Sequence, residues 1–194
     1  MASQEANRLI VAMTGASGAL YGVRLLERAL EIPLETHFIA TRWAQVTLNE
    51  ETDYRITAVR HLAHTTYSEN DQSAQIASGS FITAGMVIAP CSAKTLAALA
   101  SGFAYNLVCR AADVVLKERR KLVLVVREAP LSGIQLRNML TLADAGAIIF
   151  PPVPAFYGRP QSVEEVVDYT VVRILDQFGF SLSSSQRWTG REGG

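Results

Sequence analysis

The first turn of the sequence has the residues of an anion site. The apolar run from Leu9 to Met13 is typical of a buried parallel strand, and it leads directly into Gly15, Ser17 and Gly18. The glycines allow a sharp turn, and the serine hydroxyl can cap a following helix, whose first N–H groups attract phosphate. The segment GASGALYG fits neither a Walker loop nor a GxGxxG turn. We therefore expect a nucleotide or flavin phosphate here, with a plain tight turn as the alternative.

A second turn of the same kind is predicted after the apolar run that ends at Ala89. Pro90 is expected to stop that strand and Ser92 to cap the next helix, which leaves the N–H groups of Ala93 and Lys94 free for a phosphate or a ring carbonyl. Cys91 lies in this turn, but no histidine or carboxylate stands beside it in the sequence, so a buried thiol is expected rather than a nucleophile. No CxxC or histidine spacing indicates a metal site.

Positive residues elsewhere could bind an anion. Arg110, Asp113 and Lys117 share one face of a predicted helix, which is typical both of a solvated ion-paired stripe and of a binding site. Arg127 and Glu128 end the apolar strand LVLVV. Burying this pair requires a salt bridge or a bound anion, and we favour the anion.

Strands and helices are predicted to alternate along the chain, which indicates an α/β fold: a single doubly wound, Rossmann-like parallel sheet flanked by helices on both faces. Strands are expected near 8–14, 34–40, 86–89, 122–126 and 147–150, and helices near 18–31, 42–50, 92–101, 107–119, 132–144 and from about 162. The segments 65–80 and 151–160 are predicted as ordered loops. Ligands of such sheets bind beyond the carboxyl ends of the strands, where TGASG, PCSAKT and REAP fall.

The length and composition are those of one compact domain, 1–194, with a C-terminal tail from about residue 181. The chain has 194 residues, of which 49% are hydrophobic and 19% charged, and its formal net charge is zero. A neutral chain without a basic, aromatic-rich run is not expected to bind nucleic acid. The low share of charged residues favours extensive subunit contacts. No apolar stretch suits a membrane helix and no signal sequence is recognised, so a cytoplasmic protein is expected.

Several motifs together resemble the UbiX-type flavin prenyltransferases, which older descriptions call phenylacrylic or phenolic acid decarboxylases. The resemblance covers about residues 8 to 188. Its motifs are TGASGALYGVRLL, ASGSF, APCSAKTLAALASG, RAADVVLKERRKLVLVVREAPL, NML, PPVPAFYGRPQSVEEVV and RILDQFG. The wider fold group is that of the flavin-containing cysteine decarboxylases, which assemble into large homo-oligomers, commonly dodecamers.

The resemblance implies a metal-free transferase. Reduced FMN would be alkylated by dimethylallyl phosphate at N5, phosphate would leave, and a second carbon–carbon bond at C6 would close a fourth ring. The prenylated FMN would pass to a UbiD-type decarboxylase. Cations that stabilise the departing phosphate suit this chemistry without a metal.

The same resemblance assigns roles to individual residues. It gives cofactor binding to Gly15, Ala16, Ser17, Thr41, Ser92, Ala93, Lys94, Thr95 and Arg127. It gives dimethylallyl phosphate binding to Ser78, Arg110, Lys117, Tyr157 and Arg173. Glu128 matches the acid/base carboxylate, with Ser17 as its partner in proton handling. Tyr157 and Arg173 could come from a neighbouring subunit.

One segment departs from the family pattern. Where relatives commonly read Ile-His-Leu-Glu-Asn-Met, this chain has Gln135 and Arg137 in place of the histidine and the glutamate, which questions a helix contact there. Three alternatives to the transferase remain open: direct decarboxylation of phenolic or phenylacrylic acids, a non-catalytic FMN-binding subunit, and decarboxylation of a cysteinyl substrate.

Overall fold

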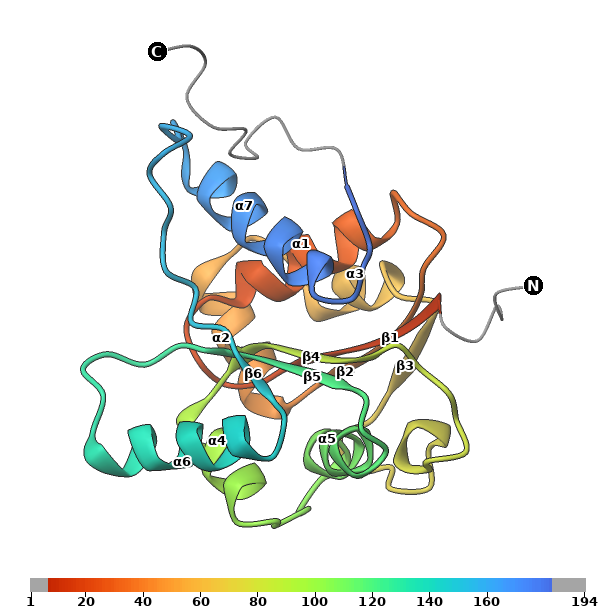
Figure 1. The fold of residues 1–194 in the computed structure, drawn as a ribbon. Helices are drawn as coiled ribbons and strands as arrows, with labels where there is room; N and C mark the ends of the chain where they lie inside the picture. The colour runs from red at the N-terminus through yellow and green to blue at the C-terminus, as the bar shows by residue number, and fades with distance from the viewer. Residues whose placement is uncertain (1–6, 183–194) are drawn as a thin grey trace.

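The fold is built on one sheet of six parallel strands. A computed structural model describes residues 7–182, and in it the strand order is β3-β2-β1-β4-β5-β6, with helices on both faces (Figure 1). The predicted α/β, doubly wound parallel sheet is therefore confirmed. The strands are β1 Arg8–Met13, β2 Glu35–Ala40, β3 Thr65–Tyr67, β4 Gly85–Cys91, β5 Lys121–Val126 and β6 Ile148–Ile149.

Successive side chains of a strand point to opposite faces, and the two cores follow this period. On β1, Leu9, Val11 and Met13 face one core, whereas Ile10 and Ala12 face the other. The first core is covered by α1 Ala19–Ala29, α2 Arg42–Glu51, α3 Ile56–His61 and α7 Val163–Asp176. The second is covered by the short 3-10 helix η2 Gln75–Ala77 and by α4 Ala93–Ala100, α5 Leu107–Lys117 and α6 Gly133–Asp144.

Two sequence predictions about local structure were wrong. Residues 65–80 are not only loop, because Thr65–Tyr67 pairs with β2 as an edge strand and Gln75–Ala77 forms a 3-10 turn. Helix α3 was not predicted either. Elements this short show little periodicity of apolar residues in the sequence, and their structure depends on contacts with distant parts of the chain.

Pro90 does not stop its strand, contrary to the prediction. Strand β4 continues through Pro90 to Cys91, and its pairing with β5 shifts register between Ile88 and Cys91. A proline is tolerated in a strand at such an irregularity because no ladder hydrogen bond from its nitrogen is required. The peptide bonds before Pro90 and Pro130 are cis.

Gln135, one of the two residues that depart from the family pattern, has a structural role at the start of α6. The Ser132 hydroxyl accepts a hydrogen bond from the Gln135 N–H at 3.3 Å, and the Gln135 side chain accepts one from the Ser132 N–H at 2.7 Å. This reciprocal capping box satisfies two N–H groups that the helix itself leaves free. Gln135 therefore stabilises the helix start.

The predicted tail from about residue 181 lies almost wholly outside the described residues. Within residues 7–182, no helix is both long enough and apolar enough to cross a bilayer.

Helix α7, the last described helix, packs against α1 through an apolar stripe that includes Val167, Val171 and Ile174.

Asp168 fixes α7 on α1 by an ion-pair cluster. Both of its carboxylate oxygens accept from Arg24 at 2.7 Å, and Arg28 donates to it as well. Burial disfavours the charged form of Asp168, but these hydrogen bonds outweigh it, so the pKa of Asp168 lies below its usual value. Only 19% of its side chain is exposed.

We expect Asp168→Asn to lower the free energy of unfolding by about 2 kcal/mol at pH 7, because two guanidinium groups lose their shared partner. Since the folded-state pKa is depressed, this contribution is present above pH about 4 and is lost as the pH falls through the folded-state pKa. Denaturant unfolding of both proteins from pH 7 down to pH 3 measures it. The exposed control Asp144→Asn should behave like the wild type; an equal loss in both variants would contradict the assignment.

Candidate functional site

The carboxyl ends of β1, β2 and β4 open into one cavity of about 310 Å³. The strand order reverses between β1 and β4, and this switch point is where open parallel sheets bind ligands. Twelve residues line the cavity: Thr14, Gly15, Thr41, Arg42, Trp43, Glu69, Asn70, Ser92, Lys94, Thr95, Tyr105 and Asn106. Gly15, Thr41, Ser92, Lys94 and Thr95 are five of the predicted cofactor-binding residues, so the fold brings these five together.

Thr14 joins the two predicted binding turns. Its buried hydroxyl donates to the Pro90 carbonyl at 2.9 Å and accepts from the Ser92 N–H at 2.8 Å. Its own N–H also bonds the Pro90 carbonyl at 3.1 Å. Sequence reasoning did not single out Thr14, because its partners lie 76 and 78 residues away.

Ser17 does not cap α1, which corrects the prediction for the first turn. The N-cap is Gly18, whose φ of 98° suits a glycine, and it offers no side-chain cap. Instead, one carboxylate oxygen of Glu51, at the end of α2, accepts from the N–H groups of Gly18 and Ala19 at 2.8 and 2.9 Å. The start of α1 is thus occupied by a built-in anion. Glu51 was missed because it is 33 residues away from Gly18.

Side chains cap the starts of α2 and α4, and the Ser92 cap of α4 was predicted. Thr41 accepts from the Ala44 N–H at 3.2 Å, and Ser92 accepts from the Thr95 N–H at 3.2 Å. The Ser92 hydroxyl also donates to the Thr95 hydroxyl at 3.1 Å. Ala93 and Lys94 follow in the first turn of α4, and the Lys94 ammonium lies 4.7 Å from the centre of the Tyr105 ring. Helix α4 therefore presents N–H groups and a cation at the cavity.

Glu69 and Asn106 also line the cavity. Glu69 accepts from the Arg42 N–H at 2.7 Å and from the Asn106 side-chain amide at 3.3 Å. Asn106 is buried and caps α5, where its side-chain oxygen accepts from the Cys109 N–H at 3.0 Å. Neither residue was predicted for the site. The only sequence signal was a polar residue, Asn106, directly before the apolar helix α5.

Arg127 and Glu128 lie at the carboxyl end of β5, and both are exposed. The anion expected to face this pair stays a prediction. The Arg127 N–H bonds the Cys91 carbonyl at 3.4 Å, which holds it beside the end of β4. Within residues 7–182, neither side chain forms an ion pair. The chain leaves the sheet directly after Val126, which is why both side chains reach the surface.

The predicted dimethylallyl phosphate residues do not all lie together in one chain. Arg110 pairs with Asp113 at 3.0 Å in the first half of α5. Lys117 ends this helix and pairs with Glu118. Ser78 bonds Ser80 in a loop held by Arg120, close to Lys117.

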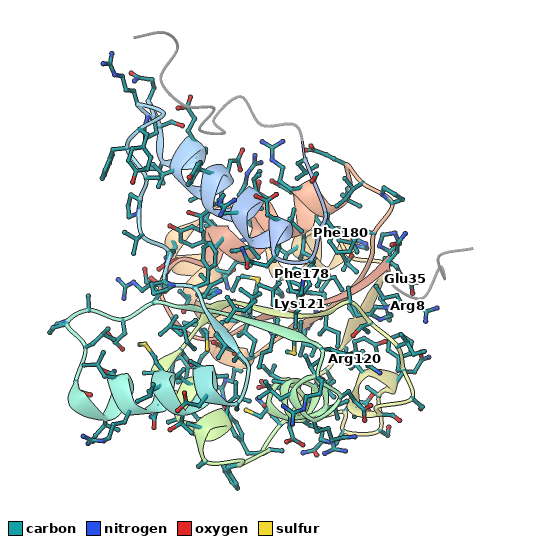
Figure 2. All side chains as sticks on the ribbon, in the orientation of Figure 1. Arg8, Glu35, Arg120, Lys121, Phe178 and Phe180 are labelled. Atoms are coloured by element: carbon teal, nitrogen blue, oxygen red, sulfur yellow. The ribbon has the colours of Figure 1, made fainter. Side chains whose placement is uncertain are left out.

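Tyr157 and Arg173 lie elsewhere. Tyr157 is 76% exposed in the loop after β6, and Arg173 pairs with Asp176 at 2.9 Å in the last turn of α7. Helices α5 and α7 cover opposite faces of the sheet, so the sheet separates Lys117 from Arg173 (Figure 1). Both helices end near the amino end of β5, where Lys121 contacts Gln177 beside Phe178 (Figure 2). The cavity lies at the other end of the strands, about 20 Å away for six residues.

The two cysteines are buried and free, as predicted. Burial raises the pKa of the Cys91 thiol strongly and that of Cys109 to about 11. A thiolate nucleophile is therefore disfavoured at either position. The described part of the chain holds no group of three or more His, Cys, Asp or Glu residues that could bind a metal ion.

Comparison with known proteins identifies close relatives. A model of the flavoprotein family matches residues 2–175. A probable UbiX-like flavin prenyltransferase of Bacillus subtilis (strain 168) is 55% identical over 185 residues, which cover 95% of this chain and 91% of the relative.

Two solved structures share the fold closely. The crystal structure of AnUbiX (PadA1) in complex with FMN and dimethylallyl pyrophosphate has a TM-score of 0.94 and 50% identity, and the match covers 96% of this chain and 100% of that one. A dodecameric FMN-dependent Ubix-like decarboxylase from Escherichia coli O157:H7 has a TM-score of 0.92 and 52% identity, with 94% and 100% coverage.

Gly15 has no room for a side chain, because an added Cβ would lie 2.4 Å from the Trp43 Cβ at the start of α2. We expect Gly15→Ala to force β1 and α2 apart and to lower the free energy of unfolding by about 1–3 kcal/mol. The control is Gly133→Ala, where the nearest atom to an added Cβ is 3.7 Å away. Thermal unfolding measures both; a Gly15→Ala protein as stable as the control would contradict the close approach.

Proposed function

The chain belongs to the UbiX-like flavin prenyltransferases of the flavoprotein family, and on that basis we propose that it transfers a dimethylallyl group from dimethylallyl phosphate to reduced FMN in a site shared between subunits. The observation that carries this proposal is the cavity at the β1/β4 switch point, which five of the predicted flavin-binding residues line. Its volume of about 310 Å³ is at the lower end of the range for small-molecule sites, about 300–1,000 Å³. Such a small volume within one chain agrees with a site that a second subunit completes.

The residues at the cavity fit a flavin monophosphate. In our proposal, Ser92, Ala93, Lys94 and Thr95 hold the phosphate at the start of α4, and Thr41 lies beside it. Gly15, Ala16 and Ser17 have small side chains, so a planar ring can approach their backbone closely. Arg127 extends from the carboxyl end of β5, beside the end of β4. When bound, reduced FMN supplies the N5 and C6 atoms that receive the dimethylallyl group.

Cations are required at the departing phosphate of the donor. The allylic carbon–oxygen bond breaks as negative charge grows on the phosphate, and fixed positive charges stabilise that charge without rearrangement. We assign this role to Arg110, Lys117 and Arg173, with Ser78 and Tyr157 as hydrogen-bonding partners. Arginine can bind phosphate through two parallel N–H groups, whereas lysine acts as a point charge.

We assign proton handling to Glu128 and Ser17. Glu128 is exposed beside Arg127, so it is free to face a ligand, and a carboxylate next to a guanidinium can accept and return a proton. Ser17 is half-buried after the first turn and does not cap α1. Its hydroxyl is therefore not committed as an N-cap and can relay a proton.

A homo-oligomer would bring these groups together. The sheet separates Lys117 from Arg173 within one chain, so one site that uses both must draw them from different chains. Large apolar side chains are exposed where such contacts could form: Trp43, Phe103, Ile134, Leu140, Val153 and Phe156. By analogy with the Escherichia coli relative, we propose a dodecamer.

Two further proposals follow from the family. The prenylated FMN would be handed to a UbiD-type decarboxylase, and the protein would work in the cytoplasm. These proposals are supported by membership of the family.

We expect the purified protein, given reduced FMN and dimethylallyl phosphate or pyrophosphate without oxygen, to add a five-carbon unit to the flavin, detected by mass spectrometry. Glu128→Gln should bind FMN normally but form at least about a hundredfold less adduct, because general acid–base groups contribute about 10²–10⁴-fold. Glu50→Gln, an exposed carboxylate on α2, is the control. Absence of adduct with the wild-type protein, or carbon dioxide release from a phenolic acid by the chain alone, would overturn the proposal.

Mixing two inactive variants tests the shared site. Lys117→Ala and Arg173→Ala should each lose most activity, and co-assembled chains should regain about a quarter of the wild-type rate if each site draws the two residues from randomly mixed chains. The control mixes Lys117→Ala with Lys117→Gln, which should regain nothing. If the first mixture also stays inactive although mass spectrometry shows mixed oligomers, the two residues do not meet between chains.

A further inference from the structure

The loop of residues 78–81 lies directly against the end of α5. Ser78 and Ser80 are exposed in this loop, and their hydroxyls are hydrogen-bonded to each other at 2.8 Å. Between them, a Cβ added to Gly79 would overlap the Glu118 carboxylate and would lie 3.1 Å from the Lys117 Nζ. Two residues assigned to the donor phosphate, Ser78 and Lys117, are therefore close together within one chain.

Arg120 joins this loop to the end of α5. Its side chain starts between α5 and β5, and its guanidinium donates to the Gly79 carbonyl at 2.6 Å and to the Phe81 carbonyl at 2.7 Å (Figure 2). A guanidinium is a planar fork that can bind two acceptors at once, whereas a lysine ammonium is a point charge on a flexible stem. Both hydrogen bonds are charge-assisted and short, so they hold the backbone on either side of Ser80.

Phe81 fixes the far end of the loop on the sheet. Its half-buried ring meets the ring of His37 edge-to-face, with 4.9 Å between the ring centres. The Arg8 guanidinium lies over the same ring, 5.0 Å from its centre. The ring therefore attaches the loop to β1 and β2, and the carbonyl of the same residue attaches it to Arg120.

The positive charge of Arg120 is not neutralised by these contacts, because both of its acceptors are uncharged carbonyls. In the described part of the chain, 7–182, no carboxylate forms an ion pair with it. The pKa of Glu118 is lowered mainly by its hydrogen bond with Lys117, and the charge of Arg120 adds to this effect. Arg120 thus combines a fixed loop with an additional positive charge beside Lys117, which suits a phosphate site.

We propose that Arg120 is a positioning residue for the donor phosphate, because it holds the loop that carries Ser78 against the Lys117 end of α5. The inference rests on the proposed function, in which Ser78 and Lys117 bind that phosphate. Without the two hydrogen bonds, the loop would have to be ordered each time the donor binds, and this entropy cost weakens binding. FMN is proposed to bind at the opposite end of the strands, so its affinity should not depend on Arg120.

The rate of adduct formation, measured at several concentrations of dimethylallyl phosphate, tests the proposal on the whole protein. Arg120→Gln should raise the KM for dimethylallyl phosphate about tenfold, the size expected for the loss of charge-assisted hydrogen bonds, and should leave the Kd for FMN within about twofold. The control Arg119→Gln removes an equal charge from an exposed neighbour and should change this KM less than about twofold. An unchanged KM in Arg120→Gln, or an equal rise in both variants, would overturn the inference.

A double-mutant cycle with Ser78→Ala separates positioning from a general loss of structure. If Arg120 acts through the loop, Arg120→Gln should raise the KM far less in the Ser78→Ala protein than in the wild type, because the hydroxyl to be positioned is already gone. Fold-changes that simply multiply would show that the two residues act independently. A general structural loss would instead raise the KM for the donor and the Kd for FMN together. Either of these results would contradict the proposal.

Arg120→Lys covers the case in which Arg120→Gln does not fold. It keeps the charge but not the planar fork, so we expect a KM for dimethylallyl phosphate about threefold above that of the wild type. A wild-type KM in this variant would overturn the inference, and the proposed function would stand as long as the wild-type protein forms the adduct. A wild-type protein that forms no adduct would overturn the proposed function itself.

Discussion

The buried hydroxyl of Thr14 is the interaction on which the candidate site depends. It donates to Pro90 and accepts from Ser92, and so it joins the ends of the two strands between which the sheet reverses its order. Without this link, the turn after β1 and the start of α4 would be positioned only by the separate strands that precede them. With it, Gly15 and Ser92 line one cavity. A buried hydroxyl that both donates and accepts is fully satisfied, which makes it a rigid joint.

The second organising feature is the distribution of charge around the helix starts. Four helices begin near the cavity or its first turn, and carboxylates occupy two of those starts: Glu51 at α1 and Glu69 at α2. At the start of α5, Asn106 is the cap and the Glu69 backbone carbonyl accepts from the Leu107 N–H. Helix α4 has Ser92 as its cap and Lys94 in its first turn. The same fold could accept anions at several helix starts. This chain leaves α4 as the start best suited to a phosphate, which agrees with a family that uses a flavin monophosphate.

Local parts of the structure were predictable, and distant contacts were not. Ser92 caps α4 as the sequence predicts, because a cap depends on residues only three positions apart. Thr41 caps α2 in the same way, although it was predicted only for cofactor binding. The roles of Glu51 and Glu69 depend on partners from 27 to 37 residues away, and those of Thr14 on partners still more distant. The motif that predicted Ser17 as a cap was correct about the turn and wrong about the capping group. Lys117 and Arg173 could be assigned from the family resemblance, but their separation by the sheet could be seen only in the fold.

The central claim is that cations from different subunits converge on the departing phosphate beside the flavin. A crystal structure of the assembled protein with FMN and dimethylallyl phosphate tests it most directly. The account predicts the flavin phosphate at Ser92–Thr95, and the donor phosphate within hydrogen-bond distance of Lys117 from one chain and Arg173 from another. A donor phosphate bound without either residue, or an assembly in which no Lys117 faces an Arg173, would contradict it.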